Sequence, residues 1–164
     1  MLKINTLRFG ELEVSEDQLF HFPRGLLGFG SNKSFVIIEL DSQKPFKWMQ
    51  SVDDPSTAFV LGDPLHFHSS YCAGLRRGEL SPLGEFQEED LVLSVIMTIS
   101  ERPEDITANL CAPLIFNLVN RYGMQYVLND QKYPVRYKIF QQCQIPMVLP
   151  FDDHPRDARS LSLR

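Results

Sequence analysis

Short apolar runs rich in β-branched and aromatic residues recur along this chain, and glycine, proline, asparagine and aspartate separate them. This pattern is typical of β-strands joined by turns. It predicts strands at 2–9, 17–22, 35–40, 46–52, 57–62, 91–99, 110–119, 124–129 and 134–140. The helical pattern is weak: we expect one short helix within 81–89 and a single turn at 102–105, with Pro103 at its first position.

Two of the expected strands carry apolar residues on both faces. In 91–99 one face holds Leu93, Val95, Met97 and Ile99, and the other holds Val92 and Ile96. In 110–119 one face holds Leu110, Ala112, Leu114, Phe116 and Leu118, and the other holds Ile115 and Val119. Strands covered on both faces occur in barrels and in sandwiches with further elements packed over them. The sequence therefore predicts a mainly β, single-domain, partly open β-barrel-like fold with little helix.

The connections divide the chain into a core and an extension. Residues 120–123 predict a hairpin connection in which Gly123 can take a positive φ. We expect a β domain over 1–140 and a C-terminal extension over 141–164, mobile after 150 because that part is polar and lacks periodicity. Deleting 152–164 should then leave the melting temperature nearly unchanged. If the extension does dock on the core, Leu161 and Leu163 are its expected anchors.

Composition places the chain among globular proteins and limits its partners. It has 164 residues, 43% of them hydrophobic and 23% charged, which suits one domain with a sizeable core. The formal net charge of −5 argues against binding a phosphate backbone and suits a basic protein partner. We therefore expect no direct nucleic acid binding.

The cysteines, the N-terminus and the apolar runs indicate the cellular compartment of the protein. Cys72, Cys111 and Cys143 are odd in number and widely spaced, so they predict small reduced hydrophobes rather than a disulfide framework. The N-terminus has no signal-peptide pattern, and no apolar run has the length of a membrane span. The expectation is a cytoplasmic protein without a membrane partner.

No residue pattern predicts catalysis or a metal site. Asp53-Asp54-Pro55 is typical of a turn, because aspartate side chains bond nearby backbone N–H groups. His66, His68 and Cys72 lack the further ligands and spacing of a zinc site. Cys111 lies in an apolar strand that indicates core, and glycines 25, 28 and 30 indicate a loop with a flexible backbone. We expect no catalytic residue, no metal and no cofactor.

In a strand over 46–52, consecutive side chains point to opposite faces, so Phe46, Trp48, Gln50 and Val52 share one face. Trp48, the single tryptophan, fits either a core position or an interface anchor. Gln50 on the same face could form hydrogen bonds at an edge.

Several blocks in collinear order over about residues 3–140 resemble the FliW family. The blocks are 6–11, 22–29, 46–55, 58–60, 63–64, 107–110, 112–115 with Asn117, 123–125 and 133–137. The chain departs from the family pattern at Leu27, Gly30 and Tyr137, and its tail is longer than the typical family core.

The resemblance implies a non-enzymatic protein that binds other proteins. FliW-like proteins bind CsrA, an RNA-binding translational regulator, and relieve its repression of flagellin synthesis; they also bind flagellin. The resemblance thus implies a monomeric flagellar assembly factor that antagonises CsrA. The partner-binding residues that we predict are Trp48, Gln50, Asp53, Asp54, Asn109, Asn117 and Gln125.

Two alternatives stay open. An RNA-binding β-barrel would need a basic face with exposed aromatic side chains. An uncharacterised enzyme would need a deep pocket that brings together two strongly perturbed titratable groups.

Overall fold

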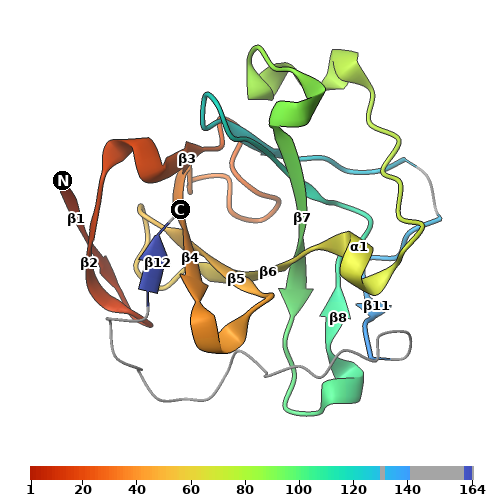
Figure 1. The fold of residues 1–164 in the computed structure, drawn as a ribbon, viewed down its shortest axis with the longest axis horizontal. Coiled ribbons are helices and arrows are strands. Elements are labelled where there is room, and N and C mark those ends of the chain that lie inside the picture. The colour runs from red at the N-terminus through yellow and green to blue at the C-terminus, as the bar shows by residue number, and fades with distance from the viewer. Residues whose placement is uncertain (130–131, 141–160, 164) are drawn as a thin grey trace.

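The computed structural model describes residues 1–129, 132–140 and 161–163, and these form a mainly β protein with very little helix (Figure 1). The strands are β1 (Leu2–Thr6), β2 (Gly10–Val14), β3 (Leu19–His21), β4 (Ser34–Leu40), β5 (Lys47–Ser51), β6 (Ala58–Gly62), β7 (Leu91–Thr98), β8 (Thr107–Ala108), β9 (Leu114–Asn117), β10 (Gly123–Gln125), β11 (Tyr137–Lys138) and β12 (Leu161–Leu163). One α-helical turn, α1, spans Pro64–Phe67. Single 3-10 turns occupy Glu16–Gln18, Asp41–Gln43, Arg77–Glu79, Ser81–Leu83, Glu88–Asp90 and Pro103–Asp105.

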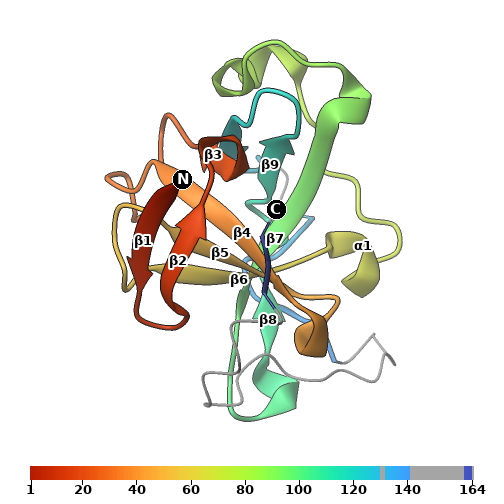
Figure 2. The ribbon, with the colours of Figure 1, turned by 60° about the vertical axis from the view of Figure 1, so that its left-hand side comes forward.

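Ten of the strands form one antiparallel sheet in the order β10-β9-β7-β6-β5-β4-β12. On the same sheet β3 pairs with β4, and β8 pairs with β7 and β11. The long strand β7 pairs with β9 along 91–94 and with β6 along 95–97, so the sheet turns a corner and nearly closes (Figure 2). The hairpin β1–β2 forms a separate sheet. The prediction of a mainly β, partly open barrel-like fold is confirmed.

Both faces of the central strands are buried, because consecutive side chains of a strand point to opposite faces. Val36 and Ile38 of β4 belong to the larger apolar cluster with Trp48. Phe35 and Ile37 of the same strand belong to a second cluster on the other face. Among the two strands that the sequence predicted to be covered on both faces, β9 is buried on both, whereas Val92 of β7 is 40% exposed. The expectation is confirmed for β9 and is wrong for Val92 and for Leu118 and Val119, which lie beyond β9 and are exposed.

Several predicted elements differ from the structure. The strands expected at 17–22, 124–129 and 134–140 are shorter, at Leu19–His21, Gly123–Gln125 and Tyr137–Lys138. The strand expected at 2–9 ends at Thr6, and the chain reverses into β2. The strand expected at 110–119 is only Leu114–Asn117, because the Asn109 side chain accepts bonds from Cys111 N and Ala112 N and holds that stretch as a turn. Within 81–89 the expected helix is wrong: two 3-10 turns flank Gly84, which has φ +68°.

The β9–β10 hairpin is correctly predicted, but its left-handed residue is Arg121, with φ 66°. Gly123 is required for a different reason. A Cβ at Gly123 would lie 2.4 Å from the ring of Phe22, which is fully buried. Glycine here permits a close approach between β10 and an aromatic side chain.

Residues 161–163 are a strand, β12, that pairs with β4. The sequence pattern did not predict this strand, and the expected mobility after 150 stays a prediction. The rest of the predicted extension, 141–160, lies outside the described residues, as does Cys143.

The remaining cysteines do not both sit in the core. Cys72 is exposed and Cys111 is partly buried, so the expectation of buried small hydrophobes is wrong for Cys72. Over the described part of the chain, no helix is long and apolar enough to cross a membrane.

Candidate functional site

The Asp53-Asp54-Pro55 segment forms the turn between β5 and β6, as the sequence predicts. Asp53 is exposed, and its Oδ2 accepts bonds from the backbone N–H groups of Lys33 (2.8 Å) and Ser34 (2.9 Å). Asp54 accepts bonds from Ser56 N (2.9 Å) and the Thr57 hydroxyl (2.6 Å). Both carboxylates therefore shape the turn, and Asp53 also ties it to the loop that precedes β4.

These hydrogen bonds keep Asp54 charged. The bond from the Thr57 hydroxyl, followed by those from Ser56, lowers the pKa of Asp54 below its ordinary value of 3.8. A carboxylate that accepts several hydrogen bonds loses them on protonation, so its charged form is favoured. At neutral pH the turn presents a fixed negative charge.

Gln50 lies beneath this turn rather than on the surface. Its side chain is fully buried, and Nε2 donates to the carbonyl oxygens of Ser51 (3.0 Å) and Thr57 (3.2 Å). The predicted contact of Gln50 with a partner therefore needs a correction: in this structure Gln50 has no surface to offer and instead holds the turn closed.

Trp48 occupies the core, which is one of the two alternatives left by the sequence. Its exposed fraction is 6%, and its Nε1 donates to Gln43 Oε1 at 2.9 Å. The guanidinium of Arg8 lies 4.4 Å from the ring centroid, and the ring of Phe9 packs against it edge-on. Trp48 therefore has almost no surface of its own, and the Arg8 side chain lies over its ring.

Asn109 and Gln125 both bond to the backbone of Ala112. Asn109 Oδ1 accepts a bond from Ala112 N, and Gln125 Nε2 donates to Ala112 O at 3.3 Å. Gln125 Oε1 also accepts a bond from Leu27 N at 2.9 Å. Both side chains are partly exposed, and Gln125 alone bonds the glycine-containing loop, at Leu27.

Asn117 is fully buried and acts as a clamp for a loop that is distant in sequence. Its Nδ2 donates to the carbonyl oxygens of Leu83 (3.1 Å) and Glu85 (3.0 Å), while its Oδ1 accepts from Val119 N. The predicted partner contact of Asn117 is corrected in the same way as that of Gln50.

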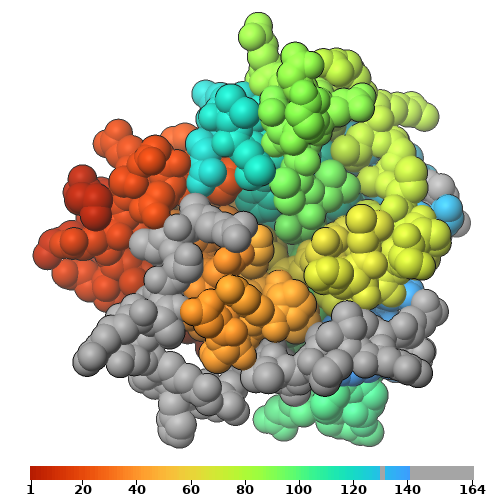
Figure 3. Space-filling model, viewed as in Figure 1, coloured from red at the N-terminus to blue at the C-terminus, as the bar shows by residue number. Residues whose placement is uncertain are grey.

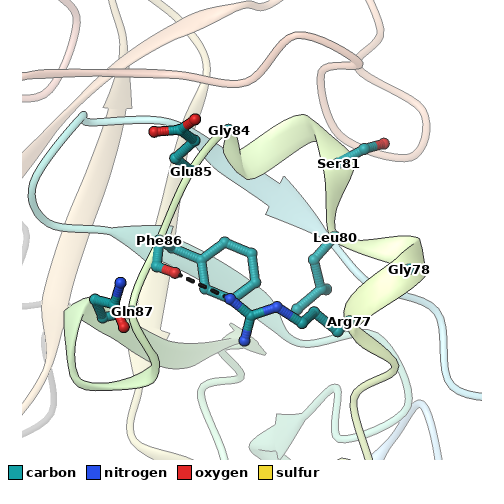
Figure 4. Close-up of a pocket in the computed structure, with 8 residues that line it drawn as sticks. All are labelled: Arg77, Gly78, Leu80, Ser81, Gly84, Glu85, Phe86 and Gln87. Carbon is teal, nitrogen blue, oxygen red and sulfur yellow. Dashed lines mark hydrogen bonds between the residues drawn. The ribbon is translucent and has the colours of Figure 1, made fainter.

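The clamped loop contains a shallow pocket of about 520 Å³ (Figure 4). Arg77 lies across its floor, 4.7 Å from the ring centroid of Phe86, and donates to the Phe86 carbonyl at 3.3 Å. Glu85 is the single carboxylate of the lining, and no histidine or cysteine contributes. The pocket does not bring together the acid and base groups that an enzyme would need.

Exposed apolar side chains lie in the loop that Asp53 ties to the acidic turn, and the sequence did not predict them as a contact surface. Leu27 is 66% exposed and Phe29 is 39% exposed. Phe29 packs edge-on against Phe59 of β6, with ring centroids 5.0 Å apart. Together with Asp53 and Asp54 these residues define what we call the loop–turn surface. Large apolar side chains in a loop rich in glycine were the signal that could have revealed it, because exposed apolar patches mark contact surfaces.

The histidines do not gather ligands. His66 lies in α1 next to Asp63, at 4.0 Å, whereas His68 ends the helix and packs against Tyr133. Within residues 1–129, 132–140 and 161–163, no three His, Cys, Asp or Glu side chains are placed to hold a metal ion.

The fold and its surface define a mainly β protein whose best candidate site is a contact surface of apolar and acidic groups. The FliW protein family model matches residues 3–139. The chain belongs to the FliW family of flagellar assembly factors, which is not an enzyme family.

Relatives and a solved structure agree. The flagellar assembly factor FliW of Syntrophus aciditrophicus (strain SB) is 39% identical over 140 residues, covering 85% of this chain and 89% of the relative. That of Caldicellulosiruptor saccharolyticus is 41% identical over 133 residues, covering 81% and 87%. A crystal structure of the flagellar assembly factor FliW superposes with a TM-score of 0.77 at 34% identity, covering 84% of this chain and 96% of that one.

Proposed function

We propose that this protein binds the translational regulator CsrA, antagonises its repression of flagellin synthesis, and also binds flagellin. On this proposal it acts as a monomer in the cytoplasm and binds no nucleic acid directly. Free flagellin then determines how much of the protein is available to CsrA. Membership of the FliW family supports this function over an RNA-binding barrel and over an enzyme.

One observation supports a particular contact surface: the loop that Asp53 ties to the acidic turn carries exposed apolar side chains. An interface of this kind can bury the apolar groups of Leu27 and Phe29 while Asp53 and Asp54 orient a basic partner. A regulator that binds RNA carries basic surfaces. An acidic protein held beside those surfaces would repel RNA even without covering them.

The charge contribution is tested with Asp53→Asn combined with Asp54→Asn. An asparagine oxygen can still accept the backbone bonds that Asp53 and Asp54 accept, so the turn should persist. We expect CsrA association at low ionic strength to slow by about two- to fivefold, with a weaker salt dependence.

The matched control is Glu88→Gln combined with Glu89→Gln, which removes the same two charges from exposed positions at the start of β7. Stopped-flow association at several salt concentrations compares the variants, and circular dichroism checks folding. Equal association rates and salt slopes for wild type and the folded Asp53/Asp54 variant would exclude the turn and favour the surface at Asn109 and Gln125.

A further inference from the structure

The outer edge of β4 is occupied by a strand from a distant part of the chain. Strand β5 takes one edge of β4 along Phe35–Glu39. On the other edge β3 pairs with Ser34–Val36, and β12 pairs with Ile38–Leu40. Figures 1 and 2 show β12 beside β4. Without β12, the last part of this edge would present unpaired N–H and C=O groups.

The occupying strand lies outside the region that defines the family. The family model ends at residue 139, whereas β12 is Leu161–Leu163. The remainder of the sheet is thus built by the family region, and β12 is added to it. A strand of three residues contributes few backbone hydrogen bonds, so it is a weak occupant of the edge.

The edge itself carries charges typical of a strand that must control its pairing. Glu39, which is 6% exposed, lies in β4 directly opposite Lys47 of β5, and their charged atoms are 2.9 Å apart. Asp41 follows immediately after the edge. Inward-pointing and flanking charges limit unspecific pairing at a sheet edge while leaving it open to a suitable strand.

The sequence of the occupant indicates what such a strand looks like. Leu161 and Leu163 stand at register positions opposite Leu40 and Ile38, two residues of the apolar β4. The chemistry is that of an extended peptide with alternating apolar residues.

We propose that the Ile38–Leu40 edge is a binding site for an extended peptide segment of a protein partner, which adds to the sheet as a strand. Strand β12 fills this site in cis and competes with the partner. This inference rests on the proposed function only for the identity of the partner. Adding a strand to a sheet edge is a general mode of peptide recognition, in which the backbone gives affinity and alternate side chains give selectivity.

The test uses the full chain with Ser162→Pro, and Ser162→Thr as its control. Ser162 stands opposite Glu39. Proline removes a backbone donor and disfavours pairing, whereas threonine keeps the N–H and favours a strand. Hydrogen exchange of peptides covering residues 36–42 should accelerate by about tenfold in the proline variant, relative to the threonine variant, because the pairing is lost.

A synthetic peptide of residues 158–164 then serves as a ligand that is independent of CsrA and flagellin. A tethered segment competes at an effective concentration of about millimolar, so the peptide is added to the proline variant in that range. It should restore slow exchange in 36–42. Unchanged exchange in the proline variant, or no protection by the peptide, would overturn the proposed site.

The competition is tested by measuring the affinity for CsrA and for flagellin. When a competing occupant is removed, the apparent Kd of the partner that uses the edge should fall by about threefold or more. Unchanged or weaker binding of both partners would overturn the competition. If neither wild type nor variant binds either protein, the proposed function fails, while the peptide experiment still decides whether the edge accepts a strand.

Discussion

Replacing Asn117 by alanine should destabilise the protein through a loop that lies more than thirty residues away in sequence. Asn117 is fully buried at the end of β9 and donates to Leu83 O and Glu85 O. Asn120 donates to the same two oxygens, at 2.8 and 3.3 Å, from a more exposed position. The segment that these bonds hold projects at the top of the molecule in Figure 3.

The magnitude follows from the hydrogen bonds lost. Asn117→Ala removes two donated bonds and the acceptor of Val119 N, and it leaves a cavity. Lost bonds of this kind contribute about 0.5–1.5 kcal/mol each, and an orphaned group costs about 1–3 kcal/mol. We expect a total of about 2–4 kcal/mol, and a fall in Tm of about 4–16 °C. Asn120→Ala should cost about 0.5–1.5 kcal/mol, because Asn117 still serves both carbonyl groups.

The double variant distinguishes the loss of these hydrogen bonds from a general loss of packing. With both asparagines replaced, the carbonyl groups of Leu83 and Glu85 lose every side-chain donor named here, so the combined cost should exceed the sum by about 1 kcal/mol. Urea unfolding of the four proteins, followed by circular dichroism, measures the coupling. Strict additivity, or an Asn117→Ala variant no less stable than Asn120→Ala, would refute the reasoning.

Three further outcomes follow from the geometry. Gly123→Ala places a Cβ 2.4 Å from the Phe22 ring, so thermal unfolding should show a loss of about 1–3 kcal/mol, and an unchanged Tm would contradict the close approach. The hydrogen bonds to Asp54 lower its pKa, so their stabilisation is complete above pH 3.8 and is lost as the pH falls through the folded-state pKa. Thr57→Val should raise the pKa of Asp54 in an NMR titration of the carboxyl carbon. An unchanged pKa would show that the hydrogen bond from Thr57 does not stabilise the charged form of Asp54. The purified protein should not shift flagellar leader RNA at physiological salt, because its net charge is −5, and a micromolar shift would favour the RNA-binding alternative.

The sequence predicted the central strands because their apolar residues are continuous and their ends are marked by turn residues. β4, β5 and β6 lie within two residues of the expected ranges, and Asp53-Asp54-Pro55 and Asp63-Pro64 end two of them. The errors arose where a side chain overrides the pattern. Asn109 bonds the backbone of the next residues and converts an apolar stretch into a turn. The strand β2 was not predicted, although its alternating polar and apolar residues fit a strand that is buried on one face.

The candidate site was predicted less well, for a physical reason. A polar residue in a sequence block can either face a partner or satisfy buried backbone groups, and the sequence does not distinguish the two. Gln50 and Asn117 belong to the second kind, since both are fully buried and bond to carbonyl oxygens. The exposed apolar residues Leu27 and Phe29 were overlooked because loops are expected to be polar.

The central claim is that one protein binds CsrA and releases it when flagellin is present. The direct measurement is a titration of the purified protein into labelled CsrA, followed by addition of flagellin, with fluorescence anisotropy as the readout. The account predicts a saturable rise in anisotropy that flagellin reverses in a concentration-dependent manner. No rise with CsrA, or a rise that excess flagellin leaves unchanged although flagellin binds the protein on its own, would contradict it.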